Sequence, residues 1–102
     1  MLDEHMNKEQ MEELAEAMLT LRNRDEAFLF FEDIFTIKEL QAVAQRLAVA
    51  RLLKKKVTYQ DIADGTGAST ATISRVNRSL TYGAGGYQMV LGRMKEASSD
   101  DE

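Results

Sequence analysis

Apolar side chains recur along the first part of the chain with the spacing of an amphipathic helix. Over residues 7–23 they come at intervals of three, four and three, which places them on one face of a helix. This stripe consists of Met11, Leu14, Met18 and Leu21. A helix of this length is marginal alone, so the stripe is expected to be buried, either within its own domain or against a partner chain.

A second helix is predicted over residues 25–34, where apolar side chains are denser and three phenylalanines occur. Such a concentration of aromatic residues is more typical of a core or a subunit interface than of a ligand pocket. Thr36 and Glu39 then fit a capping box, which predicts a third helix running to about Lys55. The first half of the chain is therefore expected to be helical.

Three lysines close this third helix, and they have two interpretations. Cations are favoured at the negative end of the helix dipole, and ammonium groups also bind phosphate. The sequence leaves both open for Lys54, Lys55 and Lys56.

The segment TYQDIADGTGASTATISRVNRSL, at residues 58–80, predicts two short helices joined by a tight turn. Thr58 and Ser69 are expected to cap the two helices, and Gly67 tolerates the positive φ that such a turn requires. Ile73 and Val76 are spaced to point inward. These features, together with a small residue before the turn, form a helix-turn-helix pattern. Thr66 departs from the pattern, because an aliphatic residue usually occupies that inward position.

The outward side of the second of these helices is unlike an ordinary solvated surface. A merely solvated face would be rich in Glu and Lys, whereas this one carries hydroxyls, one methyl, one amide and arginines, and no acid occurs between Gly65 and Met94. Such side chains can approach base edges and phosphates closely. The outward residues are expected to be Thr70, Ala71, Thr72, Ser74, Asn77 and Arg78, with Arg75 at the edge.

The net charge of −4 conceals an uneven distribution. Residues 1–35 carry ten acids and three bases, whereas residues 36–82 carry eight bases and three acids. The acidic total argues against a protein that coats nucleic acid indiscriminately. The basic middle segment permits a local phosphate-binding surface, because only charges at the contact matter there.

Other classes of protein are disfavoured. No cysteine is present, which excludes disulfides and thiolate metal sites and suits the cytoplasm. No apolar run approaches membrane-spanning length, and the N-terminus lacks the pattern of a secretory signal. His5 is the single histidine, and no acid is paired with a nucleophile or base, so neither an enzyme nor a metal site is expected.

The stretches FTIKELQAVAQRLAVARLLKKKVTYQDIA and GASTATISRVNRSL together resemble the Trp repressor superfamily, and most closely its YerC/YecD-type members. The resemblance covers about half of the chain. It implies an all-α fold, in which an intertwined helical homodimer carries two helix-turn-helix motifs and binds double-stranded DNA. By position, Thr70, Ala71 and Ser74 correspond to base-facing residues. Gln60, Thr72 and Ser79 correspond to residues near phosphates.

The resemblance also implies a small-molecule pocket. Thr36, Arg46, Arg75 and Ser79 stand at positions that bind tryptophan in the repressor, but Val76 replaces a glycine that leaves space for the indole. A β-branched side chain would fill that space. Tryptophan is therefore not expected as a corepressor, no cofactor is expected, and the identity of any effector is unknown.

The sequence thus predicts one helical domain over residues 1–97, with its helix-turn-helix at about 58–80. The dimerisation helices are expected at about 7–55 and 87–96. A glycine-rich segment after Leu80 is interpreted as a hinge, and residues 98–102 are expected to form a disordered acidic tail. The predicted function is sequence-specific transcriptional regulation as a homodimer, with repression the expected sign. The alternative is a helix-turn-helix module that docks on another regulator or a polymerase subunit.

Overall fold

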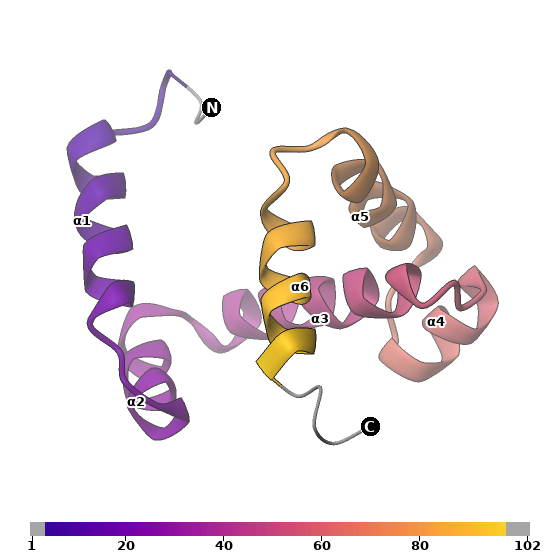
Figure 1. The fold of residues 1–102 in the computed structure, drawn as a ribbon, viewed down its shortest axis with the longest axis horizontal. Coiled ribbons are helices and arrows are strands. Elements are labelled where there is room, and N and C mark those ends of the chain that lie inside the picture. The colour runs from indigo at the N-terminus through magenta and orange to yellow at the C-terminus, as the bar shows by residue number, and fades with distance from the viewer. Residues whose placement is uncertain (1–3, 98–102) are drawn as a thin grey trace. The chain divides into compact units, whose positions relative to one another are not determined.

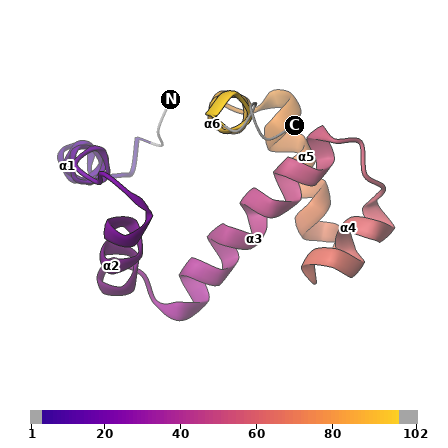
Figure 2. The same cartoon turned by 60° about the horizontal axis from the view of Figure 1, so that its bottom comes forward.

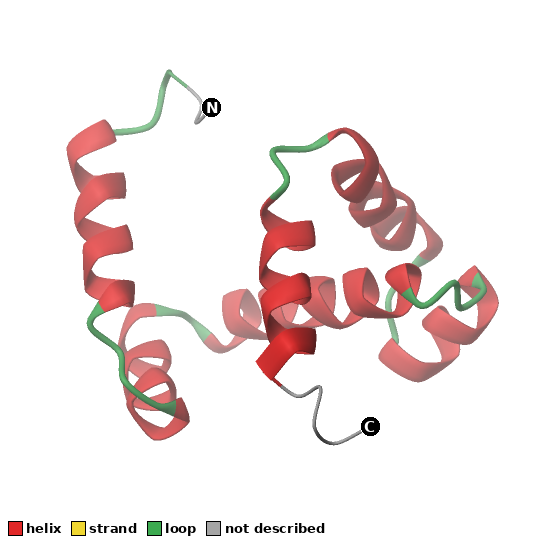
Figure 3. Ribbon diagram, in the orientation of Figure 1, coloured by secondary structure: helices red, strands yellow, loops and turns green. Residues whose placement is uncertain are grey.

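The computed structural model describes residues 4–97, and within them the chain forms six helices and no strand (Figure 3). The predicted all-α class is confirmed. The chain divides into two compact units, one up to Leu40 and one from Gln41, which we describe separately. The single domain over residues 1–97 stays a prediction, and the predicted acidic tail at 98–102 lies outside the described residues.

The first unit contains α1 (Lys8–Leu19) and α2 (Arg24–Ile34), drawn in indigo and purple in Figure 1. The side-chain oxygens of Asn7 and Asn23 cap these helices, accepting hydrogen bonds from the N–H groups of Gln10 and Glu26 at 3.0 and 2.9 Å. The sequence predicted that the first helix would extend to about residue 23. It ends at Leu19 instead, where the Thr20 hydroxyl donates to a carbonyl of the last turn at 2.7 Å.

None of the described residues of the first unit is buried. The rings of Phe31 and Phe35 meet edge to face at 5.8 Å, and the predicted stripe of α1 is only half-buried. Several large apolar side chains are exposed outright, namely Leu19, Phe28, Leu29, Ile34 and Ile37. This unit therefore lacks a core of its own within one chain.

The long helix α3 (Ile37–Lys54) begins with the predicted capping box. The Thr36 hydroxyl accepts from the Glu39 N–H at 3.1 Å, and the Glu39 carboxylate accepts from the Thr36 N–H at 2.9 Å. Because these hydrogen bonds favour the ionised carboxylate, the pKa of Glu39 lies below its ordinary value. The prediction of this helix start is confirmed.

The second unit holds the core, formed where α3 meets α4 (Tyr59–Thr66), α5 (Thr70–Tyr82) and α6 (Gly86–Ala97). Figures 1 and 2 show α4 and α5 folded against the C-terminal part of α3, with α6 following α5. Burying an aliphatic side chain fully contributes about 1.5–3 kcal/mol. The buried residues are Val49, Ala50, Ile62, Ala68, Ile73, Val76 and Leu91.

Candidate nucleic-acid interface

The turn between α4 and α5 has the predicted helix-turn-helix geometry. Thr58 and Ser69 cap the two helices through their hydroxyl oxygens, at 3.2 and 3.1 Å from the N–H groups they accept from. Gly67 ends α4 in the left-handed conformation, with φ of 74°, and its N–H donates to the Ala63 carbonyl at 2.9 Å. A residue with a Cβ would be strained there, which confirms the expected reason for this glycine.

Thr66, which departs from the usual aliphatic pattern, is fully hydrogen-bonded. Its hydroxyl donates to the Ile62 carbonyl at 2.7 Å and accepts from the Ala68 N–H at 3.1 Å. Its own carbonyl accepts from the side-chain amide of Gln45 at 3.1 Å. The hydroxyl thus closes the end of α4, and Gln45 ties that end to α3, so the half-buried polar residue carries little desolvation penalty.

Helix α5 is divided into an inward and an outward face. Ile73 and Val76 are buried, as predicted. The outward face of α5, as we define it, comprises the exposed residues Thr70, Ala71, Ser74, Arg75, Asn77 and Arg78. No acidic residue lies in its first turn. Ser79 is also exposed, at the border between the two faces.

Thr72 differs from the prediction that it points outward. It is half-buried and lines a cavity beneath α5, and its hydroxyl oxygen accepts from the Ser69 hydroxyl at 3.1 Å. The cause is helical register, since Thr72 lies one position before the buried Ile73 and one turn before Val76. The contact of Thr72 with phosphate remains a prediction, although the side chain is not exposed on the outward face as expected.

Helix α5 also continues two residues beyond the predicted end at Leu80 and finishes at Tyr82. Tyr82 is exposed, and it is not among the predicted contacts. The signal was available, because Tyr82 follows Ala71, Arg75 and Arg78 in a helical repeat of four, three and four residues.

The three lysines at the end of α3 are all exposed. The Val57 N–H donates to the Leu52 carbonyl at 3.1 Å and the Lys56 N–H to the Leu53 carbonyl at 3.0 Å, which is the Schellman arrangement. Lys56 occupies its left-handed position, with φ of 63°, where glycine is the usual residue. The run therefore ends α3, as predicted. The helix-dipole interpretation and the phosphate-binding interpretation of its ammonium groups both stay predictions.

Gln60, a predicted phosphate contact, is exposed in the first turn of α4. Its side-chain amide donates to the Asp64 carboxylate at 3.1 Å. This bond lies within one helix and on its exposed side, so it orients the amide at modest energetic cost.

A cavity of about 330 Å³ lies between α3, α5 and the start of α6. Four of the five predicted effector-pocket residues line it, namely Arg46, Arg75, Val76 and Ser79. Thr36, the fifth, belongs to the first unit, so its part in the pocket stays a prediction. Ala42, Gln45, Thr72 and Tyr87 also line the cavity. None of these four was predicted as a pocket residue, because they come from three separate helices.

The lining gives the cavity a definite chemistry. Arg46 and Arg75 supply guanidinium groups, Thr72 and Ser79 supply hydroxyls, and no acidic side chain is among the lining residues. Hydrogen-bond donors with positive charge suit an anionic group. Val76 is 3% exposed, and its methyl groups form part of the wall.

Residues 4–97 contain no cluster of three or more side chains able to hold a metal ion. In the same part of the chain no helix is long and apolar enough to cross a membrane.

The family is identified by comparison with known proteins. The model of the Trp repressor protein family matches residues 9–95, and the chain belongs to this family. It is 46% identical to the uncharacterized protein YerC of Bacillus subtilis (strain 168) over 99 residues, which cover 97% of this chain and 94% of YerC. The predicted resemblance to the superfamily and its YerC-type members is confirmed.

Solved structures show the same fold. A TrpR-like protein from Eubacterium eligens ATCC 27750 superposes with a TM-score of 0.85 at 50% identity, covering 90% of this chain and 95% of that one. A second structure, from Staphylococcus aureus, gives 0.86 at 48% identity, covering 92% and 94%. The chain therefore has the all-α, Trp repressor-like fold that was predicted.

Proposed function

We propose that this protein is a sequence-specific, DNA-binding transcriptional repressor that acts as a homodimer through α4 and α5. The observation that carries the proposal is the outward face of α5, which is exposed, rich in small hydroxyl side chains and arginines, and free of acid. Helix α5 is anchored from behind by Ile73 and Val76. A rigid helix with small polar residues at its N-terminal end suits entry into the major groove.

Within this proposal the contacts divide by chemistry. Thr70, Ala71 and Ser74 lie in the first turns of α5 and face base edges and thymine methyl groups. The remaining candidates bind the sugar-phosphate backbone and set the register of the helix on the duplex. These are Gln60, Thr72, Arg75, Asn77, Arg78, Ser79 and the lysines Lys54, Lys55 and Lys56.

Dimerisation is supported by the first unit. Its described residues form no core, and exposed aromatic and aliphatic side chains occur on both of its helices. Apolar surface of this kind is expected to be covered in solution, and a second copy of the chain offers a matching surface. Two copies of α5 in a two-fold dimer would contact half-sites about one DNA turn apart.

We further propose that L-tryptophan does not act as the corepressor. Val76 lies in the wall of the cavity, where its two methyl groups take up space that a flat indole ring would need. Calorimetric titration with L-tryptophan is expected to show no binding at micromolar concentrations. Micromolar binding would overturn this part of the proposal.

The decisive experiment is selection of bound fragments from a random DNA pool by the purified protein near physiological salt. We expect a near-palindromic consensus, both with and without L-tryptophan. Replacement of Thr70 and Ser74 together by Ala should reduce preference for that consensus roughly ten- to a hundredfold, because two hydroxyl contacts are lost. Thr20→Ala, which removes a hydroxyl from the first unit, serves as the matched control and should leave the preference unchanged.

Enrichment of no consensus in either condition would contradict the DNA-binding proposal. It would favour the alternative function, in which the exposed apolar surface of the first unit docks on another regulator or a polymerase subunit.

A further inference from the structure

We propose that Tyr82 is an additional DNA contact, whose phenol hydroxyl donates a hydrogen bond to a backbone phosphate at the far edge of the surface bound by α5. The inference rests on the proposed function, because it extends the outward face of α5 by one helical turn. It concerns a residue that neither the helix-turn-helix pattern nor the resemblance to the family singled out.

The position of Tyr82 in the helix is the first argument. Positions 71, 75, 78 and 82 are separated by four, three and four residues, so their side chains form one line along a helix. All four are exposed, and two of them are Arg75 and Arg78. The tyrosine thus continues the same cationic line that the proposal places against DNA.

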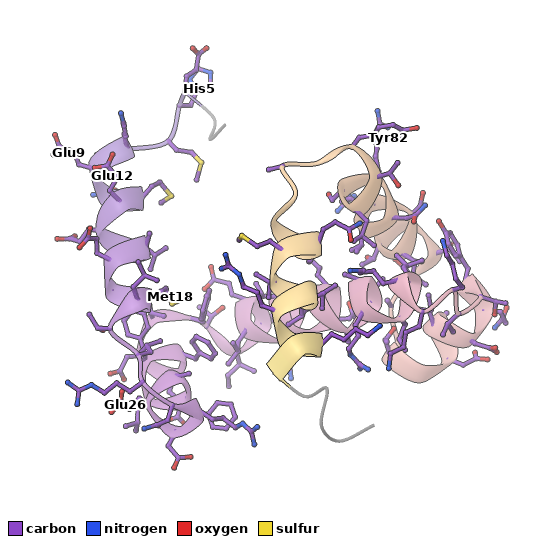
Figure 4. All side chains as sticks on the ribbon, in the orientation of Figure 1. His5, Glu9, Glu12, Met18, Glu26 and Tyr82 are labelled. Carbon is purple, nitrogen blue, oxygen red and sulfur yellow. The ribbon has the colours of Figure 1, made fainter. Side chains whose placement is uncertain are left out.

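Exposure is the second argument. Tyr82 is 82% exposed, and Figure 4 shows its side chain extending away from the end of α5. Leu80, two residues earlier, packs against the core instead. The ring of Tyr82 therefore contributes little to the packing of this chain, and tyrosine is typical of surfaces that bind a partner through an apolar ring and a polar tip.

The end of the helix keeps Tyr82 in this position. A Cβ at Gly83 would clash with the Ser79 carbonyl oxygen, and the Gly83 N–H donates to that same oxygen at 2.9 Å. The backbone of Gly83 itself is extended, with φ of −81° and ψ of −164°, so Tyr82 is the last helical residue, with its side chain still in register with Arg75 and Arg78.

The length of α5 indicates which part of DNA Tyr82 can contact. A helix rises about 1.5 Å per residue, so the eleven steps from Ala71 to Tyr82 span roughly 16 Å. The major groove is about 12 Å wide. With the first turns of α5 against base edges, its C-terminal end lies at the level of the sugar-phosphate backbone, where a phenol O–H finds phosphate oxygens as acceptors.

The contributions of Tyr82, a neutral donor, and Arg78, a cation, to DNA binding can be separated by their salt dependence. Arg78→Ala removes a charge, so it should weaken binding and reduce the dependence of log K on log salt by about one. Tyr82→Phe removes only the hydroxyl. It should weaken binding roughly 3- to 10-fold and leave the salt dependence unchanged, because no counterion is released by a neutral side chain.

The experiment uses the full-length protein and a DNA site taken from the selected consensus. Operators carrying a single neutral methylphosphonate at successive positions are bound by wild type and by Tyr82→Phe. We expect wild type to lose affinity at one phosphate where Tyr82→Phe loses none. Thr20→Ala, which removes a hydroxyl from the first unit, is the control and should reproduce the wild-type profile.

The outcomes separate this contact from the proposed function. If wild type selects a consensus but Tyr82→Phe matches it in affinity and interference profile, the Tyr82 contact is wrong and DNA binding stands. If Tyr82→Phe instead raises the dimer dissociation constant without changing the interference profile, a partner chain covers Tyr82 and the inference is also wrong. If wild type selects no consensus, both proposals fall together.

Discussion

The two units of the chain differ in how far they bury their apolar side chains. The second unit buries seven residues from four helices and the turn between α4 and α5. None of the described residues of the first unit is buried, although its two helices carry three phenylalanines and three leucines. The helices of the first unit, α1 and α2, each have a side-chain cap at the N-terminus. Helix formation is therefore local, whereas the two helices of the first unit do not by themselves bury their apolar side chains.

In the proposed function, the second unit binds DNA and the first unit forms the dimer. A self-contained helix-turn-helix keeps α5 in one orientation, as the proposed DNA binding requires, because its core consists of residues from a single chain. A unit without a core is suited to build one jointly with a partner. In the proposed dimer, the concentration of protein then controls the stability of the first unit and hardly affects that of the second.

The largest effect is expected from a charge placed on the exposed apolar surface of the first unit. Leu29 is 66% exposed in the chain, so Leu29→Asp has little reason to destabilise an isolated unit. In a dimer it would bury an unpaired carboxylate, at a cost of roughly 3–5 kcal/mol. Sedimentation equilibrium should show a dimer for wild type and a monomer for Leu29→Asp at the same micromolar concentration.

The matched control for this experiment is Tyr82→Asp, at a more exposed position, on the second unit. It should leave the dimer intact. A Leu29→Asp protein that sediments like wild type would remove the distinction between the two units.

A second test compares a buried with an exposed isoleucine. Ile73 is fully buried, whereas Ile37 is 77% exposed. Ile73→Ala should reduce the free energy of unfolding by about 2–5 kcal/mol, equally at all protein concentrations. Ile37→Ala should have a smaller effect that appears only at concentrations where the dimer forms, as measured by urea unfolding. A concentration-independent loss for Ile37→Ala would indicate burial within one chain.

The same difference explains how much could be predicted from the sequence. Thr36, Thr58, Ser69 and Gly67 were predicted correctly because caps and tight turns depend on residues three or four positions apart. The inward positions of α5 followed from periodicity for the same reason. Four of the five predicted pocket residues do line one cavity, which the resemblance to the family made possible.

The errors arose where periodicity continued past the end of a helix or stopped before it. Leu21 keeps the spacing of the α1 stripe, but the Thr20 hydroxyl bond ends that helix at Leu19. Tyr82 lies beyond the predicted end of α5, because that prediction rested on Leu80 as the last inward residue. Thr72 was predicted to face outward with the other small polar residues of α5, but its position in the helix puts its side chain beside the cavity. Residues that meet only through tertiary packing, such as Gln45 and Tyr87, carried no local signal.

Two glycines two residues apart test how strictly the turn of the second unit is determined. Gly67 has a φ of 74°, and a Cβ there would make only an ordinary contact with Gln45 at 3.9 Å. Gly67→Ala should therefore destabilise the protein by about 1–2 kcal/mol through backbone strain alone. Gly65 lies within α4 with open space around it, so Gly65→Ala should stabilise it by about 0.4–1 kcal/mol. Thermal unfolding of both variants checks the opposite signs, and equal signs would contradict the assigned turn.

The smallest effect is expected at Lys56, where stability and DNA binding should move in opposite directions. Lys56 is the one non-glycine residue with positive φ among the described residues, and glycine at such a position is favoured by about 1 kcal/mol. Lys56→Gly should therefore raise the free energy of unfolding by about that amount. It should also weaken DNA binding and reduce the slope of log K against log salt by about one, because one phosphate contact is lost.

The control is Lys55→Gly, at a position without positive φ. It should show the same loss of binding without the gain in stability. If Lys56→Gly is more stable and binds DNA as tightly as wild type, the lysine serves only the end of α3, and the phosphate interpretation of this residue is wrong.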